Sequence, residues 1–409
     1  MSSISISEYK LNSDNLEISF KSSSSSEISS SKFHYIWLRD SCQCSKCYMK
    51  ETEQRLIDTF ELSIGIIPKE IKIDSINNHL SIIWDKEFNT KTQQLNHTEE
   101  EEEDHITIFK IDWLYNHSYY PHLNINYKKI VQFDNGKLNR KFWDVESIRS
   151  NIPTVEFKDV MSNDESVGDW CSKIFKFGFC IVDNVPISPI DTEALINRIS
   201  FIQPTHYGGF WDFTSDLEIH DAAYTNIAIP LHTDGTYFSE PSGLQLFHLL
   251  KHDGEGGDTT IADGFHVAHV LKEEFPQYYD ILTKVKLSFH SAGEPGIFME
   301  PNTSRSIIEL NPVTNEVEMI RWNTSDRSSF MNFSNLSTND DNGDGGEVLP
   351  LFYKAMFKFH EILESPKYEF WYKLKPGQCL IFDNWRVLHS RKTSFTGERR
   401  MCGAYINRD

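Results

Sequence analysis

A histidine and an aspartate two positions apart, with a second histidine far downstream, are the residues of this 409-residue chain best suited to bind a reactive metal. His232 and Asp234 follow an apolar residue and precede a glycine, which predicts the end of a β-strand. Side chains two positions apart on a strand point the same way, so both can reach one ion. His389, after another apolar segment and a turn, would complete a two-histidine, one-carboxylate set. Such a set holds iron(II) and leaves coordination positions open for a co-substrate and dioxygen.

An arginine follows the second histidine by ten positions, so we expect Arg399 on the next strand of the same barrel. Its planar guanidinium could hold the distal carboxylate of 2-oxoglutarate through two parallel hydrogen bonds. Thr259, in a Gly-Gly-Asp-Thr-Thr segment, would add a hydroxyl to that carboxylate. The sequence therefore predicts 2-oxoglutarate as the co-substrate of an iron(II) oxygenase.

The order and spacing of the three predicted metal ligands and Arg399 resemble those of the taurine-dioxygenase-like 2-oxoglutarate oxygenases. Within that group the chain is similar to the carnitine-biosynthesis enzymes that act on trimethyllysine and gamma-butyrobetaine. The similarity extends from about Phe33 to Asp409, and its most specific stretches are residues 207–225, 232–248, 256–265 and 382–409. The resemblance implies a double-stranded β-helix (jelly-roll) catalytic domain behind a small zinc-binding β domain. It also implies hydroxylation coupled to decarboxylation of 2-oxoglutarate, with ascorbate returning over-oxidised iron to iron(II).

The resemblance further implies an aromatic cage around the cationic end of a quaternary-ammonium substrate. A trimethylammonium group has no N–H, so it must be recognised by dispersion and by the electron-rich faces of rings. The positions that match the family's cage are all aromatic here: Tyr207, Trp211, Tyr224 and Tyr405. The alternative is that these side chains fill a core, since aromatic residues make up 13% of the chain.

Two residues bear on the opposite end of the substrate. Asp221 stands where the family's gamma-butyrobetaine enzymes use an amide, and a carboxylate there would repel a substrate carboxylate but pair with the α-ammonium of trimethyllysine. Asn323 is a candidate donor to the substrate's carboxylate. Both residues favour hydroxylation of trimethyllysine at C3, although Asp221 could also be a turn residue. The alternatives are hydroxylation of gamma-butyrobetaine to L-carnitine, hydroxylation of trimethyllysine within a protein, and a non-catalytic metal-binding module.

Three of the seven cysteines, Cys42, Cys44 and Cys47, fall within six positions. An odd number of sparse cysteines argues against a disulfide framework, and thiolates at this spacing suit tetrahedral zinc. By the family resemblance His105 is the fourth ligand, with His97 as its main alternative. A closed site of this kind would be structural and would stabilise a small domain that lacks a large core. Three free thiols are the alternative.

The charge balance limits the class of partner. There are 40 basic and 60 acidic residues, a net charge of −20, which disfavours nucleic acid and suits a cationic small molecule. No apolar run is long enough for a membrane span. The N-terminus has neither an apolar signal core nor an arginine-rich transit pattern, so we expect the cytoplasm, with the mitochondrial matrix as the alternative that the resemblance suggests. A homodimer is left open.

Hydrophobic patterning predicts an α+β, mainly β chain with four parts: a weakly structured segment over 1–32, a zinc-binding domain over 33–120, a linker over 121–152 and the dioxygenase domain over 153–409. Strand-like runs in the first half cover 33–38, 64–67, 71–73 and 80–84. In the dioxygenase domain we expect helices over 159–175, 191–202 and 349–363, and a strand over 178–182. Many short strands with Gly and Pro turns complete the predicted jelly roll.

Overall fold

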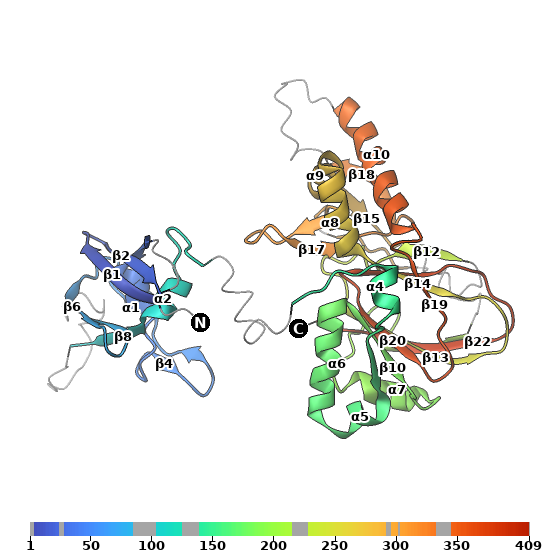
Figure 1. Ribbon diagram of the computed structural model, residues 1–409, viewed down its shortest axis with the longest axis horizontal. Coiled ribbons are helices and arrows are strands. Elements are labelled where there is room, and N and C mark those ends of the chain that lie inside the picture. Colours follow the sequence, from blue (N-terminus) through green and yellow to red (C-terminus); the bar gives the residue numbers. More distant parts are fainter. Residues whose placement is uncertain are drawn as a thin grey trace. The chain divides into compact units, whose positions relative to one another are not determined.

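The computed structural model describes residues 4–23, 28–84, 104–124, 139–214, 228–291, 296–301, 303–332 and 345–408. The chain divides into two compact units, Met1–Asn135 and Gly136–Asp409 (Figure 1). Within the described ranges, every helix is too short or not apolar enough to span a membrane.

The first unit contains two three-stranded antiparallel sheets that share one apolar core. The first sheet consists of β1 (Ile4–Leu11), β2 (Asn15–Ser22) and β3 (Ile28–His34), and the second of β6 (Pro68–Asp74), β7 (His79–Trp84) and β8 (Ile106–Lys110). Strand β2 buries Leu16, Ile18 and Phe20 on one face, as the period-2 alternation of a half-buried strand requires. The shorter elements are α1 (Tyr35–Asp40), β4 (Tyr48–Met49), β5 (Gln54–Arg55), the 3-10 turn η1 (Thr59–Glu61) and α2 (Ile111–Asn116).

Three expectations for this unit are wrong. Residues 1–32 are not weakly structured, because β1, β2 and most of β3 lie within them; the alternation of β2 is hidden among serines and charged residues. The run over 33–38 is not one strand, since α1 begins at Tyr35. Residues 64–67 are not a strand, since Ile64 and Gly65 form a turn and the strand that follows begins at Pro68.

The second unit is built on two sheets whose residues line a common cavity. The larger sheet has the order β11-β22-β13-β20-β10-β9 and the smaller one the order β12-β21-β14-β19. Their strands are β9 (Thr154–Glu156), β10 (Phe179–Asp183), β11 (Phe210–Thr214), β12 (Ile229–His232), β13 (Leu244–His252), β14 (Thr259–Asp263), β19 (Phe370–Tyr372), β20 (Cys379–Asp383), β21 (Val387–Arg391) and β22 (Arg399–Ile406). All neighbours are antiparallel except β9 and β10. Two-stranded ribbons pair β15 (Lys286–Phe289) with β18 (Arg327–Asn332), and β16 (Ile308–Leu310) with β17 (Val317–Ile320). This is the jelly roll predicted from the sequence.

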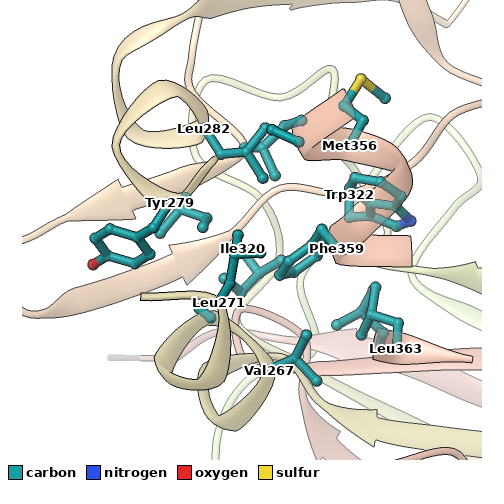
Figure 2. Packing of buried hydrophobic residues seen from close by; sticks show 14 of the residues in the cluster. Val267, Leu271, Tyr279, Leu282, Ile320, Trp322, Met356, Phe359 and Leu363 are labelled. Carbon is teal, nitrogen blue, oxygen red and sulfur yellow. The ribbon is translucent and has the colours of Figure 1, made fainter. Parts of the chain in front are cut away.

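Helices cover the second unit in two groups (Figure 1). The helices are α4 (Val145–Arg149), α5 (Phe157–Ser162), α6 (Asp164–Phe177), α7 (Pro189–Ile196), α8 (Gly264–Glu274), α9 (Pro276–Lys284) and α10 (Gly345–Leu363). Apolar residues of α5, α6 and α7 pack with one face of the larger sheet. In the other group, Val267 and Leu271 of α8, Leu282 of α9 and Phe359 of α10 surround Trp322 and form a separate core (Figure 2). The predicted helix over 349–363 lies within α10.

The boundaries of other predicted elements need correction. Part of the expected linker over 121–152 belongs to the second unit's core, because Trp143 is fully buried there and α4 follows it. The helix expected over 159–175 is two helices, since Asn163 adopts an extended conformation and its side chain caps α6. The helix expected over 191–202 starts two residues earlier and ends six residues earlier, as α7.

A buried ion pair fixes the start of β21. Two nitrogens of the Arg386 guanidinium donate to the carboxylate of Asp263 at 2.7 and 3.0 Å, and both side chains are 1% exposed. The remaining donors bind the carbonyls of Lys141 and Lys176. A buried charge is tolerable only when it is paired and hydrogen-bonded in this way. The pair therefore ties the end of β14 to the start of β21, the strand that carries His389.

Replacing Phe359 with alanine should destabilise the second unit by about 3–5 kcal/mol, because a fully buried ring would leave a cavity in the core around Trp322. Phe357→Ala on the same helix is the matched control, since that side chain is 71% exposed and should cost little. Pulse proteolysis in urea, read on peptides of the second unit, measures both. Equal losses would contradict the assigned packing.

Candidate active site

The antiparallel pairing of β12 and β21 brings the two predicted histidine ligands together. His232 stands directly opposite His389 in the register, and Asp234 follows the end of β12. The Nε2 atom of His232 lies 3.1 Å from Oδ1 of Asp234, and Nε2 of His389 lies 3.8 Å from Oδ2. One ligand atom from each residue falls within 4.8 Å of the others. Two atoms at right angles around one ion, each about 2.1 Å from it, are about 3 Å apart, so the set fits a single metal.

Hydrogen bonds orient two of the three predicted ligands, His232 and Asp234. Nδ1 of His232 lies 2.8 Å from the carbonyl oxygen of Pro230, so the proton is assigned to Nδ1 and the lone pair to Nε2. One carboxylate oxygen of Asp234 accepts from Nε2 of Gln245 at 2.8 Å and from the hydroxyl of Tyr405 at 3.0 Å. Both donors come from adjacent strands of the larger sheet, where the two residues face each other in the register.

Asn384 fixes the backbone on which Asp234 is carried. Its side-chain oxygen accepts from the Asp234 N–H at 2.8 Å, and its amide nitrogen donates to the carbonyls of Asp234 and Ser242 at 2.9 and 3.0 Å. Because Asn384 is nearly fully buried and its side chain uses both polar atoms, this loop has little freedom. Gln245 and Asn384 were not predicted from the sequence, since their roles depend on strand pairing over long sequence separations.

Charges around the three ligands set their protonation. Burial alone would raise the pKa of Asp234, but the hydrogen bond from His232 and the charges of both histidines hold it well below its usual value. Burial, with a smaller contribution from the charge of His232, lowers the pKa of His389 to about 3. Burial opposes protonation of His232 too, yet the hydrogen bond and charge of Asp234 raise the pKa of that histidine, with a smaller contribution from Asp326. An ionised carboxylate beside a neutral His389 is the donor set that a divalent cation requires.

The ligands open into a cavity of about 540 Å³ between the two sheets. The predicted site residues that line it are His232, Asp234, His389, Arg399, Thr259, Tyr207, Trp211, Tyr405 and Asn323. Asp221 and Tyr224 lie outside the described residues. The cavity is also lined by Arg391, Tyr237, Gln245 and Asp326, none of which was predicted from the sequence.

Two buried arginines form a cationic end of this cavity. Arg399 is 8% exposed and Arg391 is 7% exposed. Burial lowers the pKa of each to about 10, with the charge of Arg391 adding to the effect on Arg399, so both remain protonated at neutral pH. Thr259 faces Arg391 in the register of β14 and β21. Arg391 could have been found from the sequence, because it stands two positions after His389 on one strand and so points to the same face.

An aromatic wall lies beside the metal ligands. The rings of Trp211 and Tyr405 meet edge to face, with centroids 4.6 Å apart. The hydroxyl of Tyr405 donates to Asp234, and burial is the main reason why the pKa of this tyrosine is raised well above its usual value, so it stays neutral. The hydroxyl of Tyr207 accepts from that of Tyr237 at 3.4 Å. The residues that line the cavity therefore include both aromatic rings and guanidinium groups.

The first unit contains a second cluster of metal-binding residues. Nε2 of His105 lies 3.3, 3.9 and 3.7 Å from the sulfur atoms of Cys42, Cys44 and Cys47. A tetrahedral zinc ion with Zn–S of about 2.3 Å and Zn–N of about 2.0–2.1 Å would separate nitrogen from sulfur by about 3.6 Å, so the four residues fit it. Arg39, buried at the end of α1, donates to the sulfur of Cys47 at 3.3 Å.

The hydrogen bond between Cys42 and Cys47 moves the two thiol pKa values in opposite directions. It is the largest cause that raises the pKa of Cys42 and the largest that lowers the pKa of Cys47 to about 7, to which the hydrogen bond and charge of Arg39 add. The alternative ligand, His97, lies outside the described residues.

Two family models match the chain. Residues 141–405 match the model described as "Taurine catabolism dioxygenase TauD, TfdA family", and residues 7–95 match "Gamma-butyrobetaine hydroxylase-like, N-terminal". The chain therefore belongs to the TauD, TfdA family of dioxygenases, enzymes that depend on iron(II) and 2-oxoglutarate.

Its curated relatives cover nearly the whole chain. It is 46% identical to trimethyllysine dioxygenase of Meyerozyma guilliermondii, over 93% of this chain and 88% of the relative. It is 34% identical to mitochondrial trimethyllysine dioxygenase of Homo sapiens, over 92% of this chain and 80% of the relative. With gamma-butyrobetaine dioxygenase of Homo sapiens the identity is 28%, over 91% of this chain and 88% of the relative.

Proposed function

We propose that this dioxygenase hydroxylates free trimethyllysine at C3, with decarboxylation of 2-oxoglutarate to succinate and carbon dioxide, as the first step of carnitine biosynthesis. One oxygen atom of dioxygen would enter the substrate and the other would enter succinate. The observation that carries the proposal is a single cavity in which a two-histidine, one-carboxylate set lies between buried arginines and an aromatic wall. The higher identity to trimethyllysine dioxygenases than to the gamma-butyrobetaine enzyme supports the choice of substrate.

In this proposal His232, Asp234 and His389 hold iron(II). When bound, the iron would activate dioxygen with electrons from 2-oxoglutarate. The protein's part is to keep the ligands in place and the site dry. Gln245 and Tyr405 would hold the second oxygen of Asp234, so that this carboxylate binds the metal through the first.

The cationic end would receive the co-substrate. Arg399 is the proposed partner of the distal carboxylate of 2-oxoglutarate, with the hydroxyl of Thr259 beside it. Arg391 would contribute a second positive charge at the same end. The guanidinium of Arg399 is 8% exposed, and burial of this charge is costly unless an anion balances it; the keto acid would be that anion.

The aromatic wall would receive the trimethylammonium group. Trp211, Tyr207 and Tyr405, with Tyr224, are the proposed cage, and each good cation–π contact is worth about 0.5–2 kcal/mol. Asp221 and Asn323 are the proposed partners of the amino acid end. Attachment at both ends would present one carbon to the iron, which is how positioning selects a reaction site.

In the first unit, Cys42, Cys44, Cys47 and His105 are the proposed ligands of a structural zinc ion. All four coordination positions would be filled by protein, so the ion would have no catalytic role. It would tie the loop after α1 to the start of β8, two segments that are more than fifty residues apart in the sequence.

The proposed reaction is tested with purified protein, iron(II), ascorbate and 2-oxoglutarate, supplied with either trimethyllysine or gamma-butyrobetaine. Mass spectrometry should find a trimethyllysine product heavier by one oxygen atom and an equal amount of succinate, and much less product from gamma-butyrobetaine. Efficient formation of carnitine with no hydroxylated trimethyllysine would favour the second substrate. Absence of substrate-dependent succinate with either compound would favour a non-catalytic module.

Gln245→Leu should weaken iron(II) binding roughly 10–100-fold, because Asp234 would lose a donor that orients its carboxylate. Gln277→Leu, at an exposed position of α9, is the matched control and should bind iron normally. The measurement is the iron concentration at half-maximal succinate formation, with a calorimetric titration of manganese(II) as a readout independent of activity. Unchanged affinity in Gln245→Leu would argue against this role.

Cys44→Ser should remove most of the bound zinc and lower the stability of the first unit, because the ion would lose one of four ligands. Cys171→Ser is the control, since that cysteine is exposed on α6 and far from the cluster in sequence. Elemental analysis gives the zinc content, and hydrogen exchange of β8 reports local stability. Equal zinc content in the two variants would exclude the proposed site.

A further inference from the structure

We propose that Asp326 receives the α-ammonium group of trimethyllysine and thereby selects this substrate over gamma-butyrobetaine. This inference rests on the proposed function and names a specificity-determining residue for it. Asp326 lies on the turn between β17 and β18 and lines the same cavity as the metal ligands.

The chemistry of the substrate limits where such a residue can be. The proposed reaction oxidises C3, and C2, the neighbouring carbon, carries both the ammonium and the carboxylate. The ammonium nitrogen is therefore only two bonds, about 2.5 Å, from the carbon that must approach the iron. Its carboxylate partner has to lie beside the metal ligands and cannot lie at a distant end of the cavity.

Among the described residues that line the cavity, Asp234 and Asp326 are the two acids. Asp234 is the proposed iron ligand, so its charge would be balanced by the metal. Asp326 is not part of the metal-binding set. The side-chain oxygen of Asp326 accepts from the hydroxyl of Thr236 at 3.1 Å, and Thr236 is only two residues beyond Asp234. Asp326 thus lies next to the loop that carries the iron ligand.

Hydrogen bonds to the side chain and to the backbone hold Asp326 at the cavity wall. The oxygen that binds Thr236 also accepts from the amide nitrogen of Asn323 at 2.8 Å, and the backbone carbonyl of Asp326 accepts from the His290 N–H at 2.8 Å. An ionised carboxylate can accept about four hydrogen bonds, so the bonds from Thr236 and Asn323 do not by themselves exclude one from an ammonium. A charge-assisted hydrogen bond in a partly buried place is stronger than one in water.

The strand register separates Asp326 from the cationic end. Along β12, Ile229 faces Arg391, and His232 faces His389; Asp234 and Thr236 come next. The order along this segment is thus arginine, metal ligands, Asp326. A keto acid bound by the arginines and an ammonium bound by Asp326 would lie on opposite sides of the iron, so neither would displace the other.

The side-chain amide of Asn323, which is bonded to Asp326, is suited to bind the carboxylate of an amino acid. One hydrogen of the Asn323 amide is donated to Asp326, and the amide has a second hydrogen that can face the substrate's carboxylate. Asp326 and Asn323, bonded to each other, would then bind the two groups attached to C2. Gamma-butyrobetaine has a carboxylate and no ammonium with N–H, so Asp326 would repel it. An ammonium has three donors, so Asp326 adds to the role proposed for Asp221.

The test compares Asp326→Asn with the wild-type enzyme on two compounds. One is trimethyllysine, and the other is 6-(trimethylammonio)hexanoate, which keeps the trimethylammonium and carboxylate groups but lacks the α-ammonium. The variant should lose about 10- to 100-fold in kcat/KM for trimethyllysine, because the charge partner of the ammonium is gone. Binding of the hexanoate, measured by calorimetry and as competitive inhibition, should be unchanged or tighter. Asp253→Asn, at an exposed loop position, is the matched control.

A merely structural role gives a different result. If Asp326 only holds the turn through Thr236 and Asn323, both compounds should weaken by the same factor, and that outcome would overturn the assignment. Undiminished binding of trimethyllysine by the variant would overturn it as well. Should the wild-type enzyme fail to hydroxylate trimethyllysine, the proposed function fails, and calorimetric binding of the two compounds still decides the role of Asp326.

Discussion

The antiparallel pairing of β12 with β21 is the constraint on which the site depends. It sets His232 directly opposite His389, and Asp234 follows within two residues. A slip of one position would turn every side chain of β21 to the other face of the sheet and leave Asp234 with one histidine. The register is protected on the far side of β21 by its pairing with β14, and at its start by the buried ion pair of Arg386 with Asp263.

Opposed charges in one cavity are the second feature that the fold maintains. Two buried guanidinium groups and the partly buried carboxylate of Asp326 line this cavity, and desolvation of such charges is costly. In the proposed function, the separation of these charges along β12 would favour a dianionic keto acid at one end and a cationic amino acid at the other. The aromatic wall is the proposed partner of the trimethylammonium group, which cannot donate hydrogen bonds.

The sequence predicts the jelly roll and the metal-binding set because side chains alternate along a β-strand. Two side chains that are two positions apart therefore point to the same face of the sheet. The same rule applies to Arg391, two positions after His389, but the sequence does not show that this strand face stays inside the cavity. The part played by Gln245 depends on pairing with a strand more than 150 residues away. Asp326 lies on a turn, and in a turn the sequence has no periodicity that would indicate where a side chain points. The strands within residues 1–32 were missed because serine and charged residues occupy the outward positions of β2.

The most direct measurement of the central claim is the visible absorption of the protein with iron(II) and 2-oxoglutarate in the absence of oxygen. Iron(II) held by His232, Asp234 and His389 should give a charge-transfer band with the bound keto acid, and binding of trimethyllysine nearby should shift it. The wild-type protein should show the band, and a His389→Ala variant that remains folded should lack it. A band of equal intensity in both proteins would mean that the two strands do not share one iron ion.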